Sequence, residues 1–461
     1  MTATLPAGRA PGAPGAPGAP GAPAHRAPAA PRRGALGAAR RQGLNTPASL
    51  RALLAGLILL SLAWGAFGGF VATLHSSAAQ SLVSVDEPLS LDARQMYQAI
   101  ADADATITAA YLASAQPPLA QRQRYQNDIA TAGTDLSRLR SGNGSQATGT
   151  ALAALSGGLP VYTGDVAAAQ AEYAMHFPLT GGSFLQVASE QAHLVLLPAA
   201  NTVFTQENAS LSAASGDASD WLTLIAALLL AVVTGMVLYR AQRWLSRRTN
   251  RTFSIGLVLA SVLLIISVAW LAAGFLTARS DLGRGFGSGS DPAENLALAS
   301  IGVQQIRGDA VLNVISRSGN GSPFAADFTT TSKNVGPGSG TWLGEAAAAQ
   351  QPGGPGAPLV SQAEQEATAW YAANSQVYNL GNHANYAAEQ TSVVTGGTAA
   401  GYDTLEARIE AAINADQGVF QAAASAGASA LSPLAGVVVA CSLLMAVCCA
   451  WAVSRRLAEY R

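Results

Sequence analysis

The sequence predicts an all-α membrane protein with four transmembrane helices and two extracytoplasmic helical-bundle domains in tandem repeat. Three observations predict this class: four long uncharged apolar runs, helical apolar spacing between them, and a strong asymmetry of arginine. The 461 residues are 49% hydrophobic and only 11% charged, whereas soluble proteins carry about 25% charged residues. This deficit of charge arises first from the apolar runs.

Four runs are long enough to cross a bilayer. A spanning helix needs about 20 apolar residues to cross about 30 Å of hydrocarbon, and it must be helical because lipid offers no hydrogen-bond partners. The predicted spans are residues 51–74, 221–239, 252–278 and 433–454. A polar arm precedes the first run, which also exceeds the 7–15 residue core of a signal peptide. We therefore expect the first run to remain as an anchor.

Arginine placement predicts the orientation. The arm up to Arg51, the loop 240–251 and the tail 455–461 together carry a net charge of +14, whereas segments 75–220 and 279–432 carry −15. Positive flanks stay in the cytoplasm. We therefore expect a multi-pass plasma-membrane protein with both termini and the Arg-rich loop in the cytoplasm and both long segments outside.

Residues 1–50 are rich in Pro, Ala, Gly and Arg, and Gly12–Pro23 repeats the triplet Gly-Ala-Pro four times. Four triplets are too few for a collagen triple helix, so the composition predicts a disordered cytoplasmic arm. The three cysteines, Cys441, Cys448 and Cys449, all lie in the last apolar run. The extracytoplasmic domains therefore hold no disulfide.

The first extracytoplasmic domain, residues 75–220, reads as an up-down-up-down bundle. Predicted helices cover Leu91–Ala115, Leu119–Arg140, 147–177 with a break at Gly157-Gly158, and Ser183–Ser215 with a kink at Pro198. Gly181-Gly182 is predicted to be a turn. We expect the first and last helices to continue from the spans without a break.

The second extracytoplasmic domain, residues 279–432, repeats this pattern less clearly. Predicted helices cover Glu294–Arg317, Gln362–Leu380 and Tyr402–Ala424. Asp104-Ala105 precedes Pro118 by the same spacing as Asp309-Ala310 precedes Pro323, about 205 residues later. A duplication of the span–domain–span unit is therefore plausible.

No catalytic constellation is present in the sequence. Walker A, GxSxG, HExxH and CxxC motifs are absent, and we expect no catalytic, cofactor-binding or metal-binding residue and no enzymatic activity. The five histidines are scattered and predicted to be isolated, and carboxylates such as Asp102 and Asp104 are predicted to lie on solvated helix surfaces. Apart from Arg51 at the start of the first, the spans contain no Asp, Glu, Lys, Arg or His, which argues against an ion-coupled transporter.

The candidate site residues are cytoplasmic arginines. They are Arg240, Arg243, Arg247, Arg248, Arg251, Arg455 and Arg456. One interpretation is topology and contact with anionic lipid headgroups; the other adds docking of an acidic cytoplasmic partner. The predicted cytoplasmic parts are too small to hold a kinase or cyclase, so another protein must read any signal.

Two resemblances add to this interpretation. Met96–Leu112, MYQAIADADATITAAYL, followed by a Pro turn and Tyr125, resembles the four-helix-bundle sensor domain of bacterial chemoreceptors and sensor kinases. The layout of four spans, two helical domains, an arginine loop and the ending RRLAEYR resembles an actinobacterial membrane protein family. Genes of that family lie beside a glutamate/aspartate-binding lipoprotein and a serine/threonine kinase of the protein kinase G group. The resemblance implies a relay from that lipoprotein outside to that kinase inside.

The sequence therefore favours a non-enzymatic transmembrane signal transducer. It leaves open a structural or assembly factor of an envelope complex, and an accessory subunit of a transporter. No nucleic-acid partner is expected, and homo-oligomerisation remains open.

Overall fold

The computed structural model describes residues 46–114, 116–142, 146–218, 220–249, 254–316 and 323–458. The predicted arm lies almost wholly outside this part of the chain. The described residues form helices and no strand, which confirms the predicted all-α class. In the first half the helices are α1 (Thr46–Ser81), η1 (Leu82–Asp86), α2 (Glu87–Ala113), α3 (Leu119–Ser141), α4 (Gln146–Ala174), α5 (Pro178–Gln191), η2 (Ala192–Leu196), α6 (Leu197–Ala218) and α7 (Trp221–Thr249). In the second half they are α8 (Ile255–Gly285), η3 (Phe286–Ser290), α9 (Asp291–Ser316), α10 (Pro323–Val335), α11 (Trp342–Ala349), α12 (Ala357–Asn382), α13 (Tyr386–Val394), α14 (Gly397–Leu431) and α15 (Leu434–Ala458).

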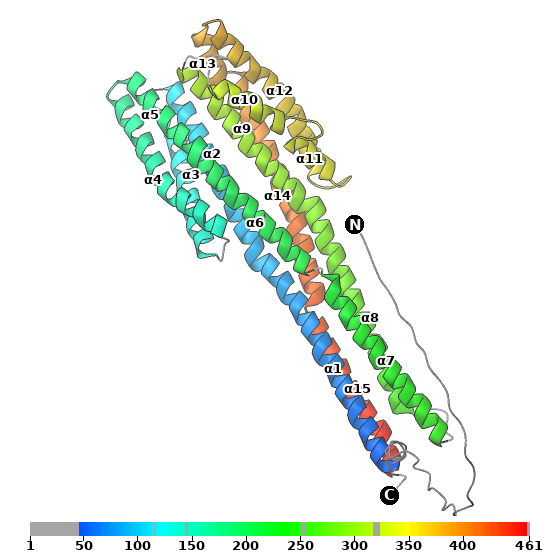
Figure 1. The fold of residues 1–461 in the computed structure, drawn as a ribbon. Helices are drawn as coiled ribbons and strands as arrows, with labels where there is room; N and C mark the ends of the chain where they lie inside the picture. The colour runs from blue at the N-terminus through cyan, green and yellow to red at the C-terminus, as the bar shows by residue number, and fades with distance from the viewer. Residues whose placement is uncertain are drawn as a thin grey trace, which may run out of the picture. The chain divides into compact units, whose positions relative to one another are not determined.

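Four helical runs are long and apolar enough to cross a membrane. They are Arg51–Ala113, Pro178–Arg247, Ile255–Ser316 and Tyr386–Arg455. Three of them contain one predicted span each, and Ile255–Ser316 contains the predicted span 252–278 from residue 255 on. The chain is therefore a multi-pass membrane protein. Large apolar side chains such as Leu59, Val232, Ile265 and Leu444 are exposed on these helices, which suits contact with lipid. In Figure 1 these segments, α1, α7, α8 and α15, lie together at one end of the drawn helices.

Three of the long helical runs pass a proline through one wide π-helical turn. Each π turn ends two residues before a proline: η1 before Pro88, η2 before Pro198 and η3 before Pro292. The amide nitrogen of the residue before each proline donates to the carbonyl oxygen five residues back instead of four. Proline has no N–H to donate, and its ring crowds the preceding turn of the helix. The wider π turn accommodates the missing hydrogen bond and the ring, so the helix continues past the proline. The kink predicted at Pro198 therefore takes the form of η2.

The spans pack closely through small residues. Trp64 of α1 donates from Nε1 to Ser267 Oγ of α8 at 3.1 Å. Gly256 of α8 lies against the backbone of α15: a Cβ atom there would be 2.7 Å from the Cys448 carbonyl oxygen. Helices in lipid associate through such small residues because close packing replaces the hydrophobic effect.

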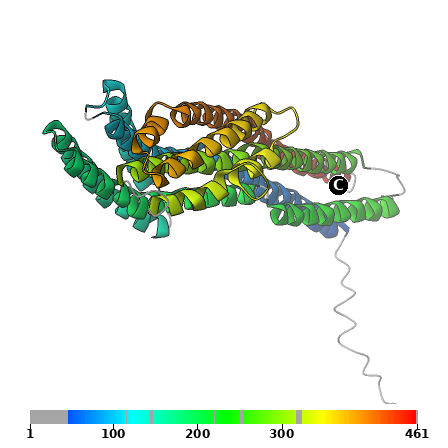
Figure 2. The same ribbon diagram turned by 90° about the horizontal axis from the view of Figure 1, so that it is seen from above.

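Helices α2–α6 and α9–α14 form one assembly beyond the spans, which we call the distal bundle. A single hydrophobic core contains residues of both segments, from Ala93 and Ile107 on α2 to Ile306 on α9 and Ile413 on α14. Helix α2 packs against α3, α6 and α9, and α9 also packs against α14. Figure 2 shows the yellow and orange helices of the second segment alongside the cyan and green helices of the first. The two predicted domains therefore share their core.

Several local expectations need correction. Helix α4 runs unbroken through Gly157-Gly158, and Gly181-Gly182 lie within α5. The chain turns instead at residues 175–177, where His176 has a φ of 66°. A Cβ atom at Gly181 would lie 2.7 Å from the Tyr173 ring, so this glycine permits close helix packing and does not make a turn. The predicted loop 240–251 is largely the last part of α7.

We expect Gly256→Ala to destabilise the packing of α8 on α15. The added methyl group meets backbone that cannot rotate away, and such overpacking costs about 1–3 kcal/mol. Thermal unfolding of the detergent-solubilised protein should show a lower midpoint temperature. Gly56→Ala is the matched control, because a Cβ atom there has no neighbour within 4 Å. Equal midpoints for both variants would contradict this packing.

Candidate functional site

The second half of helix α2 is enclosed on all sides within the distal bundle. Every residue from Ala99 to Tyr111 is buried. A helix in this position has no solvated face, so its polar side chains must find partners inside the protein. Asp102 and Asp104 are 8% and 2% exposed. The prediction that they lie on a solvated surface is therefore wrong.

Asp102 belongs to a group of charged residues that we call the Arg124 cluster. Arg124 on α3 donates to both oxygens of Asp102, with Nε–Oδ2 at 2.7 Å and Nη2–Oδ1 at 2.9 Å. The same Nη2 lies 3.2 Å from Glu406 Oε2 on α14, and Gln304 Nε2 on α9 donates to Glu406 Oε1 at 3.0 Å. One guanidinium thus connects the two segments, and bidentate pairing fixes its orientation.

Asp128 adds a third carboxylate to the Arg124 cluster. Burial first, and then the nearby Asp102 carboxylate, raise the pKa of Asp128 to about 8 against the opposing charge of Arg124. Asp128 therefore holds a proton at neutral pH, which leaves two carboxylates facing one guanidinium. Such an excess of negative charge is unusual in a protein interior.

Asp104 belongs to a second group, the His193 cluster of His193, Asp104, Asp309 and Asp327. His193 Nε2 lies 3.5 Å from Asp104 Oδ2, and its Nδ1 lies 3.8 Å from Asp309 Oδ1. Ser189 donates to Asp104 Oδ2 at 2.7 Å. Burial lowers the pKa of His193, but the hydrogen bond and charge of Asp104 and the charges of Asp309 and Asp327 outweigh it and raise the pKa to about 9.

The prediction that the histidines are isolated is wrong for His193. It lies on η2, where the π turn directs its ring between α2 and α9, and only 20% of its side chain is exposed. His176 is exposed. The two aspartates noticed as a mark of duplication, Asp104 and Asp309, both face His193.

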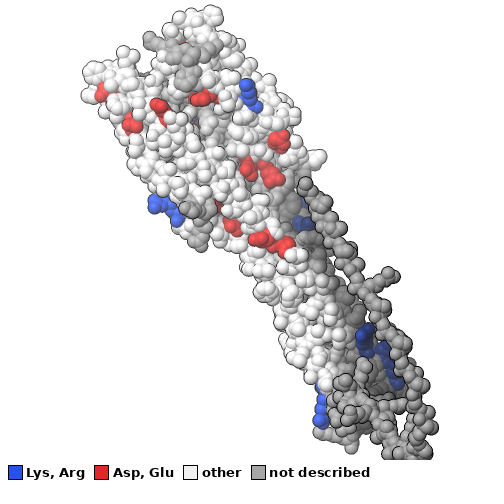
Figure 3. Space-filling model, in the orientation of Figure 1, with Lys and Arg blue, Asp and Glu red and all other residues white. Residues whose placement is uncertain are grey.

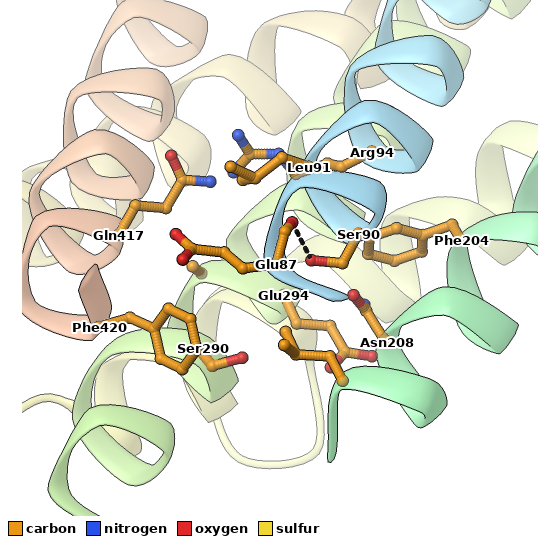
Figure 4. A pocket seen from close by; sticks show the side chains of 12 residues that line it. Glu87, Ser90, Leu91, Arg94, Phe204, Asn208, Ser290, Glu294, Gln417 and Phe420 are labelled. Atoms are coloured by element: carbon orange, nitrogen blue, oxygen red, sulfur yellow. Dashed lines mark hydrogen bonds between the residues drawn. The ribbon is translucent and has the colours of Figure 1, made fainter. Parts of the chain in front are cut away.

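A pocket lies at the end of the distal bundle nearest the spans, and we call it the basal pocket (Figure 4). Its walls come from α2, α6, η3, α9 and α14, with residues Glu87, Ser90, Leu91, Arg94, Phe204, Asn208, Leu211, Ser290, Ala293, Glu294, Gln417 and Phe420. Helices α2 and α9 continue from spans through η1 and η3, and α6 and α14 lead to spans α7 and α15. The basal pocket is therefore where the four helices attached to the spans meet.

The basal pocket holds charge of both signs. Burial lowers the pKa of Arg94 to about 10, with the Glu410 charge opposing, so Arg94 keeps its charge at neutral pH. With its amide oxygen toward Arg94, Gln417 accepts hydrogen bonds from both terminal guanidinium nitrogens. Burial raises the pKa of Glu87 and of Glu294. A pocket lined by one guanidinium and two carboxyl groups offers partners to both ends of a small zwitterion.

The predicted arginine site lies at the opposite end of the spans. Arg240, Arg243 and Arg247 are exposed on the last turns of α7. Arg243 donates to the Tyr239 hydroxyl at 3.4 Å, and the Arg455 guanidinium lies 4.7 Å from the centre of the Trp451 ring on α15. Arg251 and the side chains of Arg248 and Arg456 lie outside the described residues. Helix α8 packs against both α7 and α15, the two helices that carry these arginines.

Comparison with known protein families finds a match that covers most of the first segment. Residues 78–216 match the actinobacterial sensor domain. Searches of curated proteins and of solved structures found no match. The sensor domain runs from the end of α1 to α6, so it includes Asp102, Asp104, Arg124 and His193. The match supports a sensing role and an actinobacterial origin for the chain.

We expect Asp128→Asn to make the protein less sensitive to pH. Asp128 binds a proton more tightly in the folded protein, with a pKa of about 8, than in the unfolded chain, with a pKa of about 3.9. Its contribution to stability is therefore complete below about pH 4 and is lost as the pH rises to about 8. The stability of the variant relative to the native protein should increase across this range.

Thermal unfolding at pH 5, 6, 7 and 8 in detergent measures this difference. Asp217→Asn, at an exposed aspartate on α6, is the control and should follow the native protein. A difference between Asp128→Asn and the native protein that stays constant with pH would contradict the raised pKa.

Proposed function

We propose that this chain is a transmembrane sensor without catalytic activity, which relays a signal from the distal bundle to a protein partner across the membrane. The observation that carries the proposal is the basal pocket, because its walls are the four helices that lead to the four spans. The sensor-domain match to residues 78–216 supports the same role. A change in packing at this pocket can shift all four spans together, as in other helix-shift transitions.

The distal bundle faces the outside and the arginine end faces the cytoplasm in this proposal. Acidic side chains gather over the distal bundle, whereas arginines gather at the far end of the spans; the visible face between them carries no charge (Figure 3). The positive-inside rule favours this orientation. Both termini would then be cytoplasmic, and the exposed arginines of α7 and α15 would contact anionic headgroups or an acidic partner.

The finer proposal concerns the signal and the partner. The family resemblance implies glutamate or aspartate as the signal, a binding lipoprotein as its carrier and a serine/threonine kinase as the cytoplasmic partner. The charge of the basal pocket indicates which class of amino acid the pocket itself can bind. Two glutamates and one arginine favour a ligand with one carboxylate and one ammonium group over an acidic amino acid with a further carboxylate. We therefore propose that an acidic amino acid acts through its binding protein and that the pocket itself accepts a small neutral zwitterion.

Cysteine labelling in intact cells tests the orientation. The background replaces Cys441, Cys448 and Cys449 by alanine, and single cysteines are introduced at the exposed positions Ser137 on α3, Gln365 on α12 and Arg247 on α7. A membrane-impermeant maleimide should label positions 137 and 365 in intact cells and position 247 only after lysis. Labelling of either distal position only after lysis would contradict the proposal.

Thermal shift of the full chain in nanodiscs with single amino acids tests the pocket. A neutral amino acid at about 100 times its dissociation constant should add about 2.7 kcal/mol of stability. Arg94→Gln should abolish the shift, because it removes the partner of the ligand carboxylate. Arg122→Gln, at an exposed arginine on α3, should retain it. A shift that survives in Arg94→Gln would show that the ligand binds elsewhere.

Deletion of the gene in an actinobacterial host tests the sensing role itself. A sensor predicts that cytoplasmic serine/threonine phosphorylation loses its response to external amino acids. The alternative role, an assembly factor of the envelope, predicts an unchanged response and an altered envelope complex instead.

A further inference from the structure

The His193 cluster has the composition of a cation site. One side-chain atom each from His193, Asp309 and Asp327 lies within 4.8 Å of the others. The three residues come from η2, α9 and α10. With Asp104, three carboxylates surround one imidazole, so a cation of charge +2 would balance the cluster better than the proton of His193 alone.

Asp309 gives a second and independent indication. It is 1% exposed, and its Oδ1 atom, the one nearest His193, accepts no hydrogen bond. A buried carboxylate oxygen without a donor is costly to the fold unless a positive group lies against it. Asp102 differs in this respect, because both of its carboxylate oxygens accept hydrogen bonds from Arg124.

The two ring nitrogens of His193 face different partners. Nδ1 lies on the side of Asp309, whereas Nε2 lies 3.5 Å from Asp104 Oδ2, which Ser189 also holds by a hydrogen bond. In metal sites a ligand histidine commonly donates its second N–H to a carboxylate, which fixes the ring. Asp104 occupies that supporting position.

The spacing of the ligand atoms leaves room for a small cation. Atoms bound to one metal at about 2.1 Å lie about 3.0–3.4 Å from one another. His193 Nδ1 and Asp309 Oδ1 are 3.8 Å apart, so these two need to move by only a few tenths of an ångström each. Asp327 is exposed and can close the remaining gap by a change of side-chain rotamer.

We propose that His193, Asp309 and Asp327 bind one divalent transition-metal cation, Zn²⁺ or Mn²⁺, with Asp104 positioning the His193 ring. An imidazole with carboxylates suits these ions better than Mg²⁺ or Ca²⁺, which prefer oxygen ligands alone. The cation would join η2, which leads to α6 and span α7, to α9, which follows span α8. This proposal goes beyond the proposed sensing of amino acids and does not depend on it.

Equilibrium dialysis of the full-length protein in nanodiscs against Zn²⁺ or Mn²⁺, followed by elemental analysis, tests the site. The protein is prepared without a polyhistidine tag, because such a tag would itself bind these ions. We expect one ion per chain in the native protein. Asp327→Asn and His193→Ala should each lower the affinity at least about tenfold. His176→Ala, which removes an exposed histidine of the same segment, should bind as the native protein does.

Two outcomes would overturn the proposal: no bound ion in the native protein, or equal binding by Asp327→Asn and the native protein. Asp327→Asn changes an exposed side chain, so its folding is secure even if His193→Ala fails to fold. An amino-acid response that persists without any metal binding would leave the sensing proposal standing and remove only this one.

Discussion

The contact between α2 and α9 is the interaction on which the rest of the structure depends. These helices follow directly from spans α1 and α8 through the π turns η1 and η3, and both are buried along most of their length. Both helices contribute small buried side chains, such as Ala103 and Ala299, to the common core, and that core encloses most of each helix. Neither segment can change its packing without the other, and both are connected to the membrane. In the proposed function, this arrangement is what allows a local change in the bundle to reach all four spans.

The buried charges give this contact its specificity. Arg124 holds carboxylates of both segments, and His193 lies between Asp104 and Asp309, one from each segment. These pairs add little net stability. Water screens the pairs of Arg124, whose side chain is 44% exposed, and desolvation offsets most of the Coulomb attraction in the more buried His193 cluster. Removing one partner, however, leaves an uncompensated charge, so the pairs select one register of α2 against α9. The clusters also lie far from the spans along α2, whereas the basal pocket lies next to them. Binding at the clusters and binding at the basal pocket can therefore act on α2 and α9 at different distances from the membrane.

The sequence alone was sufficient for the spans and for the helical class, because hydrocarbon demands long apolar helices and leaves an unambiguous pattern. It was insufficient for the charged clusters. Met96, Ile100 and Ile107 suggested one apolar face on α2, and the alanines between them are compatible with burial or exposure. Only the enclosing helices decide that Asp102 and Asp104 are buried. His193 was missed because its partners lie about 90 residues before it and about 115 after it. Pro198 indicated a kink, but the choice of a π turn depends on packing around the helix.

Amide hydrogen exchange of the native protein and of Ile306→Ala, both in nanodiscs, tests the common core most directly. Ile306 is fully buried on α9 in the second segment, and its truncation should cost about 2–5 kcal/mol. If the two segments share one core, peptides from α2 and α6 in the first segment should exchange faster in the variant, together with those of α9 and α14. Faster exchange confined to residues 291–431 would show two independent domains and contradict the account.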